Sequence, residues 1–138
     1  MMNDLLKECK YECRVSTVMN KDSRNYGKQC MFDDYEETCW FSDSGLPQWI
    51  KITFEKINTI TGFEIQFQGG FAGKVCLVNI DDDNESTIYQ EYFYPNDINP
   101  SQRFALKNPT TGKTFKIIFN ESTDLFGRIV VYKLCIFS

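Results

Sequence analysis

Two segments of the chain alternate strictly between apolar and polar residues. Residues 50–54 read Ile-Lys-Ile-Thr-Phe, and residues 63–67 read Phe-Glu-Ile-Gln-Phe. Side chains of a β-strand point alternately to its two faces, so each segment has one apolar and one polar face. The pattern predicts two half-buried strands, each packed by its apolar face against a core.

Further short apolar segments follow along the chain and are separated by turn-forming residues. The expected strands are 50–54, 63–67, 75–80, 87–94, 104–106, 115–119 and 128–137. The strand at 104–106 is expected to end at Asn108-Pro109, because proline cannot donate to a β-ladder. About eight strands at spacings of about 8–14 residues, with no helical pattern between them, predict an all-β sandwich or barrel.

The length of 138 residues is sufficient for one domain. Residues 1–13 are polar and charged apart from Leu5-Leu6, and we expect them to form a frayed or helical lead-in. Residues 14–138 are expected to form the β-domain. The chain has no apolar run that suits a signal peptide or a membrane span, so we expect the protein in the nucleus, the cytoplasm or both.

Charge and composition narrow the class of function. The net charge is −4 and no residue is histidine. Without a basic stripe, direct binding of nucleic acid is not expected. The absence of histidine excludes Ser-His-Asp and Cys-His catalytic sites within the chain, and no pattern separates an acid from a base among its 19 Asp and Glu residues. We therefore expect a binding protein and not an enzyme.

The chain has six cysteines, at positions 9, 13, 30, 39, 76 and 135. No pair has the C-x-x-C spacing of a zinc or redox motif. In a reducing compartment we expect free thiols, several of them packed as small apolar side chains. A second interpretation, in which Cys9 or Cys13 forms a disulfide with Cys135, requires an oxidising compartment.

The segment from 32 to 52 carries an acidic loop that leads into Thr-x-Trp, followed by a turn and then by Gln-Trp and an alternating strand. This order resembles the discoidin, or coagulation factor C-type, family of galactose-binding-like domains. The residues on family positions are Asp33, Thr38, Trp40, Gln48 and Trp49, whereas Asp34 and Tyr35 stand where the family has Gly and a second Asp. The closing segment 132–138 is also similar to the last strand of the family. The resemblance implies an antiparallel jelly-roll β-sandwich over almost the whole chain.

Three further segments are similar to a subfamily of small nuclear-receptor-associated proteins with a single such domain: 33–40, 66–71 and 126–128. The resemblance implies a non-enzymatic, protein-binding regulator of transcription whose partner is a nuclear receptor or a related regulator. Other members of the wider family bind carbohydrates or phospholipids, or are subunits of larger assemblies. These functions are the alternatives for this chain.

The acidic loop is the candidate metal site. In sugar-binding members of the family a structural calcium sits at this loop, and the resemblance carries its ligands to the side chains of Asp33 and Thr38 and the carbonyls of Cys30 and Tyr35. The relatives add a Glu from the closing strand, where this chain has Lys133, whose ammonium group would repel the ion. We therefore expect no cofactor, with calcium at Asp33 and Thr38 as the alternative.

Two segments are candidates for partner binding, and their residues are Gly69, Gly70, Phe71 and Arg128. The glycines give the loop backbone freedom, and Phe71 either projects toward a partner or folds back over the open end of the sandwich. The guanidinium of Arg128 either contacts a ligand or forms a structural pair with Asp33, Asp43 or Asp124.

Overall fold

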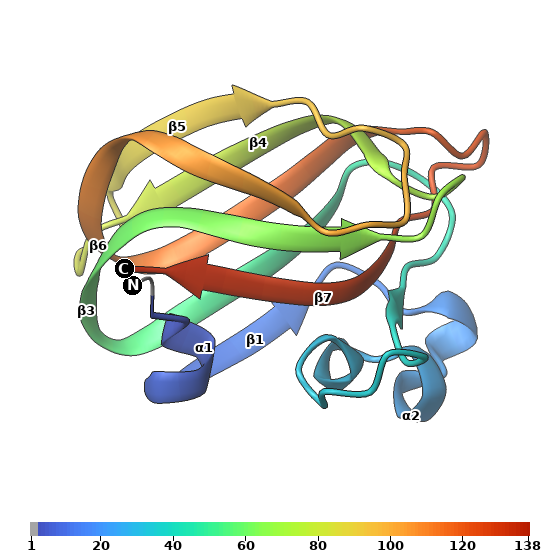
Figure 1. Ribbon diagram of the computed structural model, residues 1–138, viewed down its shortest axis with the longest axis horizontal. Coiled ribbons are helices and arrows are strands. Elements are labelled where there is room, and N and C mark those ends of the chain that lie inside the picture. Colours follow the sequence, from blue (N-terminus) through green and yellow to red (C-terminus); the bar gives the residue numbers. More distant parts are fainter. Residues whose placement is uncertain (1–2) are drawn as a thin grey trace.

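The computed structural model describes residues 3–138 and contains two packed β-layers (Figure 1). The strands are β1 (Tyr11–Val15), β2 (Trp40–Phe41), β3 (Gln48–Phe67), β4 (Gly73–Asp81), β5 (Thr87–Phe93), β6 (Gln102–Ser122) and β7 (Val130–Phe137). The helices are α1 (Leu5–Glu8), η1 (Met19–Lys21), α2 (Ser23–Tyr26) and η2 (Lys28–Met31). Every pairing between these strands is antiparallel, which confirms the predicted all-β sandwich.

Two long strands, β3 and β6, take part in both layers. In the first layer the N-terminal half of β3 lies between β1 and the C-terminal half of β6, and β4 and β5 follow. In the second layer the C-terminal half of β3 lies between the N-terminal half of β6 and β7, and β2 follows. The layers therefore have the orders β1-β3-β6-β4-β5 and β6-β3-β7-β2.

The bends of β3 and β6 correct the expectation of shorter, separate strands. The segments 50–54 and 63–67 lie on one continuous strand, and β6 runs through Asn108-Pro109 where a strand end was expected. The register of β3 against β6 breaks between Ile60 and Gly62, and Pro109 lies in the stretch of β6 that this break leaves unpaired with β3. Its missing N–H therefore removes no bond from that ladder.

Aromatic side chains from the two layers meet in the core. Phe63 and Phe115 are in edge-to-face contact with ring centroids 5.5 Å apart, and Phe67 and Phe119 are in similar contact at 5.9 Å. Trp40 on β2 is fully buried and packs against Phe119 at 6.3 Å. Burial of each phenylalanine stabilises the fold by about 1.5–3 kcal/mol, so these contacts hold the layers together.

The two ends of the chain lie side by side (Figure 1). The backbone N–H of Ser138 donates to the carbonyl of Asn3 at 3.2 Å. The carboxylate of Asp4 accepts from the N–H of Leu6 at 3.0 Å, which caps α1, and from the N–H of Ile136 at 3.2 Å. A single aspartate thus begins the first helix and fastens it to the closing strand.

The N-terminal segment contains more structure than a lead-in. Leu5 and Leu6 of α1 are buried in the core, and β1 begins at Tyr11 and pairs with β3. The sandwich therefore starts inside the segment 1–13. The helices are all short, and none within residues 3–138 has the length and hydropathy needed to cross a membrane.

Candidate functional site

The loop before β3, the loop after β3 and the loop between β6 and β7 meet at one end of the sandwich (Figure 1). Backbone hydrogen bonds join them. The N–H of Gly45 donates to the carbonyl of Phe126 at 2.8 Å, and the N–H of Val130 donates to the carbonyl of Phe71 at 3.0 Å. We call this end of the sandwich, formed by residues 42–47, 68–72 and 123–129, the loop end. It brings together the candidate partner-binding residues, which lie in two separate segments of the sequence.

Gly69 and Gly70 form a tight turn that side chains of a neighbouring loop hold in place. The N–H of Gly69 donates to the Oδ1 atom of Asn99 at 2.7 Å, and the N–H of Gly70 donates to Oδ1 of Asp97 at 2.8 Å. Gly70 has φ +92°, a conformation that other residues adopt only with strain. The two glycines therefore shape the loop that carries Phe71.

Phe71 lies folded against the end of the sandwich and is half-buried. Its ring packs on Phe41 of β2 with centroids 5.5 Å apart, and Phe41 in turn contacts Tyr26 of α2 at 5.7 Å. The guanidinium carbon of Arg128 lies 5.2 Å from the centroid of the Phe71 ring. One side of the ring is therefore fixed by packing, while part of it stays accessible.

Arg128 forms a two-point ion pair with Asp124. Its Nε donates to Oδ2 at 2.8 Å and its Nη2 donates to Oδ1 at 3.1 Å, while the backbone N–H of Arg128 also donates to Oδ2 at 3.1 Å. The hydrogen bond from Arg128 holds the pKa of the Asp124 carboxyl below its ordinary value. Of the three acidic partners considered from the sequence, Asp124 is the one the structure places against this guanidinium.

The most exposed apolar side chains of the loop end are not among the residues that the sequence pattern predicts for partner binding. Leu125 is 97% exposed, Phe126 is 66% exposed and Leu46 is 42% exposed. The ring of Phe126 also faces Arg128, with its centroid 5.4 Å from the guanidinium carbon. We call Leu46, Phe71, Leu125 and Phe126 the rim patch. The feature of the sequence that could have indicated this patch is the apolar pair 125–126 in a loop that ends in a glycine.

The acidic loop gathers the oxygen atoms that the family resemblance indicated. The Oγ1 of Thr38 lies 2.7 Å from both carboxylate oxygens of Asp33, and 3.3 Å from the carbonyls of Cys30 and Tyr35. Calcium takes about six to eight oxygen ligands, and this set of one carboxylate, one hydroxyl and two carbonyls falls short of that number. A calcium ion at this loop would therefore need further oxygen ligands, such as water molecules.

Lys133 stands on β7 near this loop. It is exposed, and no ion pair within residues 3–138 joins its ammonium group to Asp33. The carboxylate of Asp33 is instead engaged by the hydroxyl of Thr38 and by the N–H of Tyr35, which donates at 3.0 Å. The loop thus satisfies its central carboxylate with its own donors.

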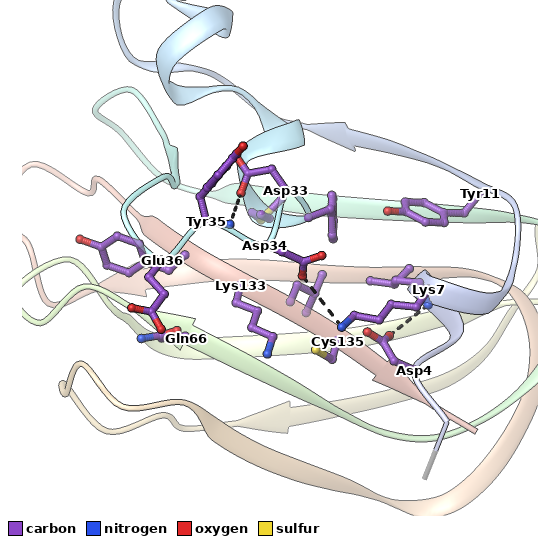
Figure 2. Close-up of a pocket in the computed structure, with 15 residues that line it drawn as sticks. Asp4, Lys7, Tyr11, Asp33, Asp34, Tyr35, Glu36, Gln66, Lys133 and Cys135 are labelled. Carbon is purple, nitrogen blue, oxygen red and sulfur yellow. Dashed lines mark hydrogen bonds and ion pairs between the residues drawn. The ribbon is translucent and has the colours of Figure 1, made fainter.

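A pocket of about 300 Å³ lies between α1, the acidic loop and β7 (Figure 2). Asp34 forms one wall and reaches Lys7 of α1, with 3.9 Å between Oδ1 and Nζ. Lys133 and Cys135 lie on the β7 side (Figure 2). The pocket carries charges of both signs and is distinct from the loop end.

All six cysteines are free thiols in the structure, and five of them are buried. Burial raises the pKa of Cys39 to about 11 and those of Cys13 and Cys135 to about 12. Thiols with such pKa values carry little thiolate at neutral pH and are weak nucleophiles. Within residues 3–138, no three His, Cys, Asp or Glu side chains form a group that could hold a metal ion.

Comparisons with known proteins agree with the resemblance seen in the sequence. The model of the F5/8 type C domain family matches residues 14–130. A Danio rerio protein named "Nuclear receptor 2C2-associated protein" is 42% identical over 123 residues, which cover 89% of this chain and 87% of the relative.

Solved structures share the fold at low sequence identity. The F5/8 type C domain of a Bacteroides fragilis protein has a TM-score of 0.81 at 16% identity and covers 99% of this chain and 95% of that chain. CpGH89CBM32-5 from Clostridium perfringens, solved in complex with GalNAc-beta-1,3-galactose, has a TM-score of 0.77 at 14% identity, with 93% and 95% covered.

Proposed function

We propose, from the premise that this chain belongs to the F5/8 type C (discoidin-like) domain family, that it is a protein-binding module without catalytic activity of its own. The family and its structural neighbours are binding modules. Three of the buried thiols have pKa values of about 11 or 12, so they are poor nucleophiles at neutral pH. A binding function needs a surface, and the loop end supplies one.

The rim patch is the observation that carries this proposal. Leu125 and Phe126 stand side by side and are mostly exposed, and Leu46 adds a third apolar side chain beside them. Aromatic and apolar side chains that are surrounded by polar residues are typical of the centre of a protein interface. Arg128 adds a fixed cation within this patch, since Asp124 holds its guanidinium in one orientation.

The partner we propose is a nuclear receptor or a related regulator of transcription, with the chain acting in the nucleus, the cytoplasm or both. Support comes from the name of the relatives, which describes them as associated with nuclear receptor 2C2. The direct experiment is titration of the purified chain against purified nuclear receptor 2C2 by isothermal calorimetry. A saturable binding isotherm supports this partner, and the absence of binding rules out this receptor.

Carbohydrate binding is the second candidate, because CpGH89CBM32-5 was solved with a disaccharide and shares this fold. A sugar site needs an exposed aromatic face together with polar groups that converge on one ligand. A glycan array distinguishes the two functions, since a protein-binding module gives no specific signal on it.

We also propose that the acidic loop keeps its shape without calcium, contrary to the alternative that Asp33 and Thr38 bind the ion. The hydroxyl of Thr38 donates to the Asp33 carboxylate and occupies the position between the loop oxygens. Lys133 stands where the resembled relatives have a carboxylate, so one negative ligand is replaced by a positive charge.

A further inference from the structure

The strand β5 forms an open edge of the first layer. It pairs with β4 on one side, and no other strand within residues 3–138 pairs with its second side. Its sequence, Thr-Ile-Tyr-Gln-Glu-Tyr-Phe, contains neither proline nor lysine. Such residues are the usual means of preventing an edge strand from pairing with another chain.

The other edges of the sandwich are protected. At the N-terminal half of β6, the hydroxyl of Tyr89 accepts a hydrogen bond from the backbone N–H of Lys107 at 3.0 Å, which occupies a donor of that edge. The edge strand β1 carries the charged residues Glu12 and Arg14. At the remaining edge, β2 has two residues and is too short to serve as a template. Among the described strands, β5 is therefore the long edge with the least protection, since its one charged residue, Glu91, lies 3.8 Å from the ammonium group of Lys107.

We propose that a second copy of this chain pairs with β5 through an antiparallel, two-fold symmetric contact centred on Gln90. In this register Gln90 faces Gln90 of the second copy, Ile88 faces Tyr92, and Tyr89 faces Glu91. Pairs of a β-branched and an aromatic residue stabilise an antiparallel ladder, and a two-fold axis makes each such pair occur twice. The strand sequence is thus complementary to itself.

The exposed side chains of the strand fit this arrangement. Ile88 is 45% exposed, Tyr92 is 55% exposed and Tyr94 is 65% exposed, so a row of apolar groups remains uncovered in the single chain. A hollow of about 740 Å³ follows the strand past these residues and reaches Lys107 of β6. Pairing would set Ile88 of each copy against Tyr92 of the other and cover part of this row.

The charges also favour self-pairing. Glu91 is the one charged residue of β5, and it does not face its own copy in the proposed register. Its carboxylate accepts from the hydroxyl of Tyr89 and lies 3.8 Å from Nζ of Lys107. No two like charges therefore face each other across the contact, although the chain as a whole carries a net charge of −4.

The test uses the residue on the two-fold axis. Gln90→Lys and Gln90→Glu each place two like charges directly opposite one another, so each variant alone should dimerise up to about fivefold more weakly than wild type. A mixture of the two variants opposes Lys to Glu and should restore the dimer. Gln29→Lys, an exposed glutamine on η2, is the matched control. Sedimentation velocity over a concentration series measures each sample.

Three outcomes decide the proposal. The β5 contact is established if wild type and Gln29→Lys form dimers, each Gln90 variant alone dimerises more weakly, and the mixture of the two variants recovers the dimer. The recovery step also excludes misfolding as the cause of the loss. A wild-type chain that stays monomeric at every concentration overturns the proposal, and so does a dimer that both Gln90 variants form as well as wild type.

Discussion

Both carboxylate oxygens of Asp124 accept hydrogen bonds from the guanidinium of Arg128, at 2.8 Å from Nε and 3.1 Å from Nη2. The pair closes the loop between β6 and β7 and fixes the direction of the guanidinium. Phe71 and Phe126 both face that guanidinium, with their ring centroids 5.2 Å and 5.4 Å from its carbon. An ion pair therefore organises the apolar surface to which we assign the binding of a partner.

The Asp124–Arg128 pair predicts how stability depends on pH. The pKa of Asp124 is lowered in the folded protein. The ion pair therefore contributes fully to stability above the pKa of an unfolded aspartate, and this contribution is lost as pH falls through the pKa of Asp124 in the folded state. Asp124→Asn should lower the melting temperature at neutral pH. The difference from wild type should shrink toward zero in acid, where both proteins lack this charge.

The matched control for this prediction is Glu37→Gln, an exposed carboxylate in the acidic loop that forms no ion pair within the described residues. Thermal unfolding followed by circular dichroism across the acid range measures all three proteins. A difference between wild type and Asp124→Asn that stays constant with pH would contradict the role of the ion pair.

From the core contacts we expect a large loss of stability when an aromatic residue that joins the two layers is truncated. Phe119 is fully buried and contacts both Phe67 and Trp40. Phe119→Ala should lower the free energy of unfolding by about 3–5 kcal/mol in urea denaturation, because it removes the ring and leaves a cavity. Phe119→Leu keeps more of the volume and should cost less. Equal losses for the two variants would mean that packing volume does not determine the effect.

The acidic loop predicts stability that is independent of calcium. Wild-type protein should melt at the same temperature in excess calcium and in EDTA, since a ligand raises stability when it binds the folded state. Thr38→Val should cost about 1–2 kcal/mol in either buffer, because it removes the hydroxyl that donates to the Asp33 carboxylate. The control is Glu37→Gln, an exposed neighbour that forms no ion pair within the described residues. A rise in the melting temperature with calcium that Asp33→Asn abolishes would show that the metal site exists.

The thiols predict an order of chemical modification. Cys9 is the one cysteine of the six that is not buried, and its Sγ lies 3.7 Å from Oδ1 of Asn58. In native protein at neutral pH, Ellman's reagent should therefore modify Cys9 first, and Cys9→Ser should remove this fast phase. The buried Cys76, whose pKa is raised by desolvation, should react only on unfolding. Fast labelling at several sites of the folded protein would contradict the burial.

Much of the fold follows from the sequence because the apolar alternation is local. Ile50, Ile52, Phe63, Ile65 and Phe67 are all buried, as the two-residue period requires. The joining of their segments into one bent strand has no local signal, because a bend of a long strand and a turn between two strands can share the same polar residues. The path of β3 from one layer to the other depends on contacts with β6 that are distant in sequence.

The candidate site was predictable in part. Phe71 and Arg128 were selected from two separate segments, and the structure brings them into contact. The ion pair with Asp124 was one of several possibilities, since a carboxylate four residues before an arginine in a loop has no fixed direction. The exposure of Leu125 could not be derived, because apolar residues in loops are often buried under neighbouring segments.

Whether the loop end binds a protein can be measured by affinity capture of tagged chains from the native cells, with the captured proteins quantified by mass spectrometry. The captures to compare are wild type, the double variant Leu125→Ser/Phe126→Ser, and Ile57→Ser, an exposed apolar control. We expect a partner that wild type and Ile57→Ser capture in equal amounts and that the double variant no longer captures. A partner retained by all three proteins, or none captured by wild type, would contradict it.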